Sequence, residues 1–115
     1  MRKFRAVLLH DDSDGHYGAG IEERVDGQTV WIASLYLGPM PSRKQAQNEL
    51  INVIEQQLAP GDEVTLKIPD FSFYKRGDEF APRFTIHSER LKKVVTARML
   101  CEDALKRRSD IIEKL

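Results

Sequence analysis

A two-residue turn constrains the fold of this chain more than any other feature. Asp26-Gly27 lies between two segments that look extended, at residues 16–23 and 29–37, and the second of them is rich in β-branched and aromatic residues. Asp-Gly between two such segments is a strong signal for a tight β-hairpin, because glycine accepts the positive φ angles that the turn requires. The pair therefore predicts two antiparallel strands near the start of the chain.

An apolar stretch precedes the hairpin, and a helix follows it. Residues 4–10 are mostly apolar and end at a run of acids, which predicts a buried strand before the hairpin. Gly38-Pro39-Met40-Pro41 ends the third strand, and Ser42 is suited to cap a helix because its hydroxyl accepts backbone N–H bonds. The helix is expected over residues 43–58, where apolar side chains recur at the spacing of one buried stripe: Ala46, Leu50, Val53, Ile54 and Leu58.

Strand and helix patterns alternate in the second half of the chain. Residues 63–68 alternate between polar and apolar positions and predict a fourth strand, and residues 71–82 are expected to form a loop or an extra ribbon. Residues 83–87 predict a short strand, after which Ser88 is expected to cap a final helix that reaches Leu115 with at most one break. The order β-β-β-α-β-β-α predicts one α/β domain over residues 1–115, with helices packed on a mixed sheet of about five strands.

Composition excludes several classes of protein and partner. The chain has 18 basic and 18 acidic residues, so its zero formal charge gives no reason to expect nucleic acid or a membrane as partner. No apolar run is long enough to span a bilayer. The single cysteine, Cys101, excludes an internal disulfide and a multi-cysteine zinc site, and its place in a helical pattern predicts a small buried side chain. We expect an intracellular, cytoplasmic protein.

Acidic residues end two of the predicted strands. Asp11 follows the first strand and Asp70 the fourth, and Glu49 lies in the helix between them. If these strands are parallel neighbours, both aspartates emerge at the carboxyl edge of the sheet, where open α/β sheets build sites. Two or three carboxylates there would suit Mg²⁺ or Mn²⁺, which activate water and stabilise a phosphodiester leaving group. Aspartates also cap turns at strand ends, and that interpretation is equally open.

The same elements resemble the ribonuclease H family over most of residues 4–75. LLHDDS is similar to the family's first strand with its metal-binding aspartate, GHYGAGI to the second, WIASLYLG to the third, NELINVIEQQL to the helix with its acid, and EVTLKIPDFSFYKR to the fourth strand with its closing aspartate. The resemblance implies a ribonuclease H fold, bound Mg²⁺ or Mn²⁺, and cleavage of RNA in RNA–DNA hybrids or structured RNA. It assigns metal binding to Asp11, Glu49 and Asp70, and catalysis to these three with Glu102 of the last helix.

The second acid of this set depends on how the helix is aligned. If the Glu-Leu pair is matched, Glu49 takes the family's position, whereas matching Ser42 to the family's threonine gives that position to Gln47. A glutamine there would remove a carboxylate on which two-metal catalysis depends. The sequence leaves both alignments open, and with them an active and a degenerate protein.

A weaker resemblance indicates a binding module. DDSDGHYGAGI is similar to the Asp-Gly-x-Tyr hairpin of HicB-type antitoxins, which carry a degenerate form of this fold. FTIHSERLKK and KRRSDIIEKL resemble a ribbon-helix-helix unit, which implies a homodimer that binds DNA or a protein partner without an ion. A phage-type accessory or inhibitor protein is a third alternative. Seven bases in the last helix predict either a solvated face or an electrostatic track for nucleic acid: Arg90, Lys92, Lys93, Arg98, Lys106, Arg107 and Arg108.

Overall fold

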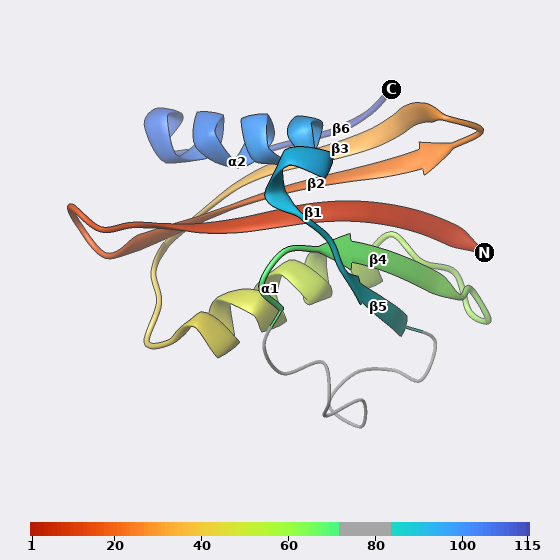
Figure 1. Cartoon of the computed structure of the whole chain (residues 1–115), viewed down its shortest axis with the longest axis horizontal. Helices are drawn as coiled ribbons and strands as arrows, with labels where there is room; N and C mark the ends of the chain where they lie inside the picture. The colour runs from red at the N-terminus through yellow and green to blue at the C-terminus, as the bar shows by residue number, and fades with distance from the viewer. Residues whose placement is uncertain (72–83) are drawn as a thin grey trace.

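The structure, a computed structural model, describes residues 1–71 and 84–115. Within these residues, a six-stranded mixed sheet lies between two helices (Figure 1) and has the strand order β5-β4-β1-β2-β3-β6. β1 to β3 are antiparallel neighbours, β4 and β5 run parallel to β1, and β6 pairs antiparallel with β3. The elements are β1 (Arg2–Asp11), β2 (His16–Val25), β3 (Gln28–Pro39), α1 (Arg43–Glu55), β4 (Val64–Ile68), β5 (Phe84–Ser88), η2 (Leu91–Lys93), α2 (Val95–Arg107) and β6 (Ile111–Lys114). The predicted mixed α/β sheet is confirmed.

The hairpin turn has the geometry that its sequence predicted. Asp26 and Gly27 both have positive φ angles, 52° and 79°. Two positive φ angles in succession are the mark of the turn type that matches the twist of paired strands. β2 and β3 pair along nearly their whole length on either side of it. The turn thereby fixes the register of the two longest neighbouring strands.

Side-chain alternation along β1 divides the core between the two faces of the sheet. Phe4, Ala6 and Leu8 belong to the larger apolar cluster, which includes the buried side of α1. Val7 belongs instead to a smaller cluster with Ala97 and other residues of α2. Because successive strand residues point to opposite faces, the two helices cover opposite sides of the sheet.

The first helix begins where the sequence predicted. The Ser42 hydroxyl oxygen accepts a hydrogen bond from the Gln45 N–H at 3.2 Å, which satisfies one of the unpaired donors of the first turn. The helix ends at Glu55, earlier than the predicted residue 58. Its buried side chains are Ala46, Gln47, Leu50, Ile51 and Ile54.

The second helix lies unusually close to β2. A Cβ atom at Gly20 would lie 1.9 Å from the Ala97 carbonyl oxygen, and one at Gly18 would lie 2.7 Å from the Leu105 Cγ. Small residues on both elements therefore set the spacing between helix and sheet. α2 packs chiefly on β1, β2 and β3. On the same face of the sheet, α2 does not cover β4 and β5.

The end of the chain differs from its prediction. Ser88 is the last residue of β5 and not a helix cap, and α2 ends at Arg107 because Arg108 adopts the left-handed conformation with φ 64°. Residues 111–114 form β6 instead of a helical turn, since the β-branched pair Ile111-Ile112 favours an extended backbone that pairs with the free edge of β3. This edge strand raises the sheet from about five strands to six, and it leaves no ribbon-helix-helix unit at residues 84–115.

Two further predictions concern Cys101 and residues 71–82. Cys101 is free and fully buried on the inner side of α2, as predicted. The predicted loop lies outside the described residues, except for Phe71, which is buried. Among the described residues, no helix has the length and apolarity needed to cross a bilayer.

Candidate functional site

Asp11 ends β1 and opens a tight turn. Its carbonyl oxygen accepts a hydrogen bond from the Gly15 N–H at 2.8 Å, and its Oδ1 accepts two more, from the Ser13 hydroxyl at 2.7 Å and the Ser13 N–H at 3.0 Å. These two bonds, the hydroxyl first, hold the pKa of the Asp11 carboxyl below its usual value. The group is therefore ionised at neutral pH, and one of its oxygens is occupied by its own turn.

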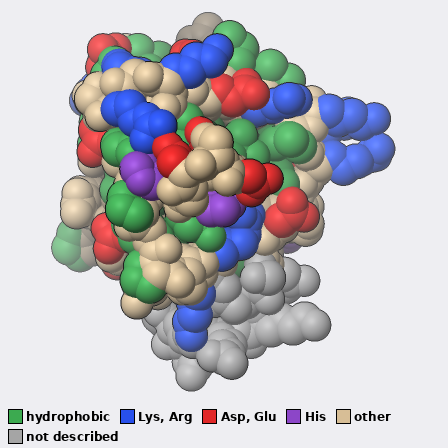
Figure 2. All heavy atoms as spheres, turned by 90° about the vertical axis from the view of Figure 1, so that its left-hand side faces the viewer, with side chains coloured by type: hydrophobic (Ala, Val, Ile, Leu, Met, Phe, Trp, Pro, Cys, Tyr) green, Lys and Arg blue, Asp and Glu red, His purple; other side chains and the backbone are tan. Residues whose placement is uncertain are grey.

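The other acids of this turn are also bonded within the molecule. The Asp14 carboxylate accepts hydrogen bonds from the His16 N–H at 3.0 Å and from the Arg108 guanidinium, and the former is the main reason why its pKa is lowered. Arg108 donates in addition to the Tyr36 hydroxyl at 2.8 Å. Asp12 lies 3.0 Å from a ring nitrogen of His10. Figure 2 shows this end of the molecule, where histidine, acidic and basic side chains crowd together.

β1 and β4 are parallel neighbours, as the sequence required for a shared acidic site. Their register, however, pairs Arg5 with Lys67. Continued by one residue, it brings Ile68, the last residue of β4, beside Ala6, five residues before Asp11. At about 3.3 Å per residue, β1 extends about 16 Å beyond the end of β4, and Asp70 lies in the turn that follows β4. β4 accordingly ends well short of the end of β1 in Figure 1.

The helix turns a glutamine, and not a glutamate, toward the end of β4. Gln47 is fully buried, and its Nε2 donates to the Asp70 carbonyl oxygen at 3.4 Å. Its Oε1 has no hydrogen-bond partner among the described residues. Glu49 is exposed on the outer side of α1. With Ser42 as the helix cap, this geometry agrees with the alignment that matched Ser42 and gave the inner position to Gln47.

Asp70 and Glu102 lie on different elements. Asp70 is exposed in the turn after β4, two residues beyond the strand, with a left-handed backbone of φ 57°. Glu102 lies on α2, 44% exposed, and its carboxylate is 3.6 Å from the Arg98 guanidinium one turn earlier. Asp11 shares a sheet face with α2, because it alternates in phase with Val7, whereas Gln47 and Glu49 belong to the helix on the other face.

An arginine side chain lies against the edge of β1 beyond the end of β4. The Arg43 Nη2 lies 3.5 Å from the Leu8 carbonyl oxygen, on the part of β1 that extends past β4. A fixed positive charge there disfavours a divalent cation. Within residues 1–71 and 84–115, no three Asp, Glu, His or Cys side chains form a group that could hold a metal ion. The described residues therefore do not fit the two-metal site that the resemblance implied.

The Cys101 thiol does not supply an alternative chemistry. Burial raises its pKa to about 12, so it stays protonated at neutral pH and is a poor nucleophile.

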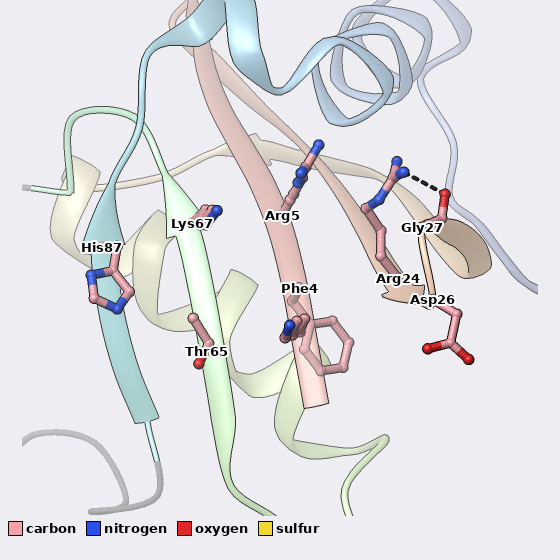
Figure 3. Close-up of a pocket in the computed structure, with 9 residues that line it drawn as sticks. Phe4, Arg5, Arg24, Asp26, Gly27, Thr65, Lys67 and His87 are labelled. Carbon is pink, nitrogen blue, oxygen red and sulfur yellow. Dashed lines mark hydrogen bonds between the residues drawn. The ribbon is translucent and has the colours of Figure 1, made fainter. Parts of the chain in front are cut away.

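No sequence motif pointed to the basic residues at the other end of β1. Lys3 and Arg5 lie there beside Lys67 of β4, lining an open cavity of about 640 Å³ (Figure 3). The available signal was weak: Lys3 and Arg5 alternate along the start of β1, and Lys67 is the one base of β4. Their meeting depends on the register of β1 with β4, which sequence patterns did not determine.

Comparisons with known proteins agree with the fold and add no sequence relationship. No protein-family model matches the chain, and no curated protein is significantly similar to it in sequence. Among solved structures, a ribonuclease H1 isolated from compost by a metagenomic approach matches with a TM-score of 0.71 and 17% sequence identity, over 93% of this chain and 96% of that one. A likeness at this identity shows the fold alone. The chain therefore has the ribonuclease H fold.

Proposed function

We propose that this chain is a ribonuclease H-fold module that binds RNA or RNA–DNA hybrids without metal-dependent cleavage. The observation that carries the proposal is Gln47, the side chain that α1 buries next to Asp70. An amide at this position brings no negative charge to a divalent ion, whereas Mg²⁺ and Mn²⁺ sites in proteins rely on carboxylates. The nucleic-acid class follows from the fold that the chain shares with a ribonuclease H1.

Two further observations support binding over cleavage. The register places the end of β4 five residues before Asp11 on β1, and ligands of one Mg²⁺ must each approach to about 2.1 Å. Arg43 lies at the intervening edge of β1. The proposal belongs with the non-catalytic alternative that the hairpin sequence suggested, and it needs no ion.

The second candidate is a small ribonuclease of the ribonuclease H type that depends on Mg²⁺ or Mn²⁺. It is favoured by the lowered pKa of Asp11, which keeps that carboxylate ionised, and by the common sheet face of Asp11 and α2. In this candidate Asp11, Glu49 and Asp70 would hold the ions, and Glu102 would complete the shell. It predicts cleavage that is lost in Asp11→Asn.

One set of measurements separates the two candidates. A labelled RNA–DNA hybrid is titrated with the protein in EDTA and in Mn²⁺ at matched ionic strength, and the same samples are analysed for cleavage. We expect equal affinity in both buffers, intact RNA, and no heat in a calorimetric titration with Mn²⁺ alone. RNA cleavage that disappears in Asp11→Asn would establish the second candidate, and failure to bind hybrid or RNA in either buffer would refute the binding function.

A further inference from the structure

The open face of the sheet at the start of β1 carries two cross-strand rows of polar side chains. Residues paired in register on neighbouring strands point to the same face, so the pairing defines each row. The face is the one that α2 covers further along, where Val7 packs on Ala97. The first row is His87, Lys67, Arg5 and Glu22, and the second is Thr85, Thr65, Lys3 and Arg24.

Two of the charged groups in these rows neutralise each other. Glu22 is 1% exposed and accepts a hydrogen bond from the Thr29 hydroxyl at 2.6 Å, with the Arg24 guanidinium at 3.3 Å. Arg24 also donates to the Gly27 carbonyl oxygen at 2.6 Å, as Figure 3 shows. Asp26 lies at the rim of the cavity. The carboxylate of Glu22, the acid in these rows, therefore already has hydrogen-bond and ion-pair partners.

The remaining bases lack such partners. Lys3, Arg5 and Lys67 form no ion pair within the part of the chain that the structure describes. Arg5 and Lys67 are direct register partners, and they lie side by side in Figure 3. Like charges directly opposite each other destabilise a sheet. The fold therefore maintains a concentrated positive charge at a cost, in a chain whose formal charge is zero.

We propose that this face binds the phosphate backbone of nucleic acid through Lys3, Arg5 and Lys67, an inference that rests on the binding function proposed above. Flexible ammonium and guanidinium groups in rows, open to solvent above the sheet, suit successive phosphates. Phe4 lines the cavity, but its ring is 1% exposed and packs in the opposite core, so it offers no platform for stacking bases. The exposed His87 ring of the first row is the other aromatic ring there, and stacking on it would not depend on base sequence. A protein partner would need apolar anchors, which the two rows do not present. Binding is therefore independent of base sequence and sensitive to salt.

A matched pair of double variants tests this surface. Lys3→Gln/Lys67→Gln removes two charges from the rows, whereas Lys44→Gln/Lys114→Gln removes two from exposed positions on α1 and β6, outside both the rows and the basic side chains of the last helix. The dissociation constant of a short fluorescent RNA–DNA hybrid is measured by anisotropy over a series of salt concentrations in EDTA. We expect the first variant to lose about five- to eightfold in affinity per lysine at about 0.1 M salt, and its log–log salt slope to fall by about one per lysine. The control should retain its affinity within about twofold and its slope unchanged.

Each outcome bears on one proposal. Wild-type protein that does not bind the hybrid refutes the binding function itself. Wild-type binding that both double variants weaken equally, or that neither weakens, refutes this surface and leaves the binding function intact. Polyglutamate serves as a competitor at the same charge concentration. If it displaces the hybrid as effectively as unlabelled hybrid does, the surface recognises acidic chains in general and the assignment to nucleic acid is wrong.

Discussion

The two ends of β1 use their charges in opposite ways. At the carboxyl end, Asp11 and Asp14 are bonded to the N–H and hydroxyl groups of their own turn, and Arg108 from the end of α2 closes over them. At the amino end, Lys3 and Arg5 face solvent beside a third base without an ion pair among the described residues. The acids that stand out in the sequence are engaged internally, and the inconspicuous bases are available to a partner. The zero formal charge of the whole chain does not reveal this difference between the two ends of β1.

The largest effect on stability is expected where α2 packs on β2 and covers one half of the sheet face. Gly20→Ala should lower the free energy of unfolding by about 3 kcal/mol or more, because its Cβ would lie 1.9 Å from the Ala97 carbonyl oxygen and backbone would have to move. Urea denaturation measures this change. Gly18→Ala is the control and should cost less, since its nearest neighbour is the Leu105 side chain. Equal costs for the two variants would mean that α2 does not rest on β2 as closely as described.

The next effect tests whether the buried end of β4 tolerates a carboxylate. Gln47→Glu should cost about 2 to 3 kcal/mol at neutral pH, because the side chain is fully buried and a charge there lacks solvation. Burial raises the pKa of the introduced carboxyl, so the loss should shrink as the pH falls and the group becomes neutral. Gln47→Met, which also removes the unpaired Oε1, should be nearly neutral. Thermal unfolding at several pH values follows both.

Adding Mn²⁺ to Gln47→Glu tests whether the acids at the carboxyl end of β1 lie close enough to α1 to share an ion. If added Mn²⁺ raised the Tm of Gln47→Glu but not that of Gln47→Met, the acids at the carboxyl end would be close enough to share an ion with α1. That result would contradict the separation of Asp11 from Asp70 inferred from the register. Unchanged Tm values would agree with it.

Local patterns predicted most of the fold, because they act over short distances. The Asp26-Gly27 turn, the Ser42 cap and the alternation in β4 each depend on a few neighbouring residues. The last segment was predicted wrongly as a helix, because the left-handed Arg108 and the pairing of Ile111–Lys114 with β3 are tertiary effects. In that segment, pairing with the free edge of β3 outweighed the local helical pattern.

The candidate site was less predictable for a related reason. Sequence patterns predicted two strands that end near Asp11 and Asp70, and the condition for a shared site, that these strands are parallel neighbours, is met. They did not determine the register, which decides whether two strand ends coincide. The same register brings Arg5 and Lys67 together. Because the register of β1 with β4 was undetermined, the sequence predicted neither the offset of the acids nor the proximity of the bases.

A third prediction concerns how the acidic turn responds to pH. Hydrogen bonds hold the pKa of Asp14 below 3.8, so its contribution to stability is present above that pH and is lost as the pH falls through the lower pKa of the folded state. Asp14→Asn should therefore lower the Tm at neutral pH, and the difference from wild type should narrow at about pH 3. Asp12→Asn, at a side chain that is 98% exposed, is the matched control and should change the Tm less. A difference that stays constant with pH would show that the Asp14 charge does not help to close this end.

The smallest expected effect has the opposite sign. Lys67→Glu should raise the free energy of unfolding by about 0.2 to 1 kcal/mol, because it replaces a like-charged cross-strand pair with an opposite-charged one next to Arg5. Lys67→Gln, which only removes the repulsion, should give a smaller gain, and urea midpoints measured side by side resolve the order. If both variants were less stable than wild type, the bases at this end would be satisfied within the molecule, as the acids are at the other. A gain in stability that accompanies weaker hybrid binding would instead mean that the repulsion is retained for the sake of a ligand, since surface charges that serve function commonly lower stability.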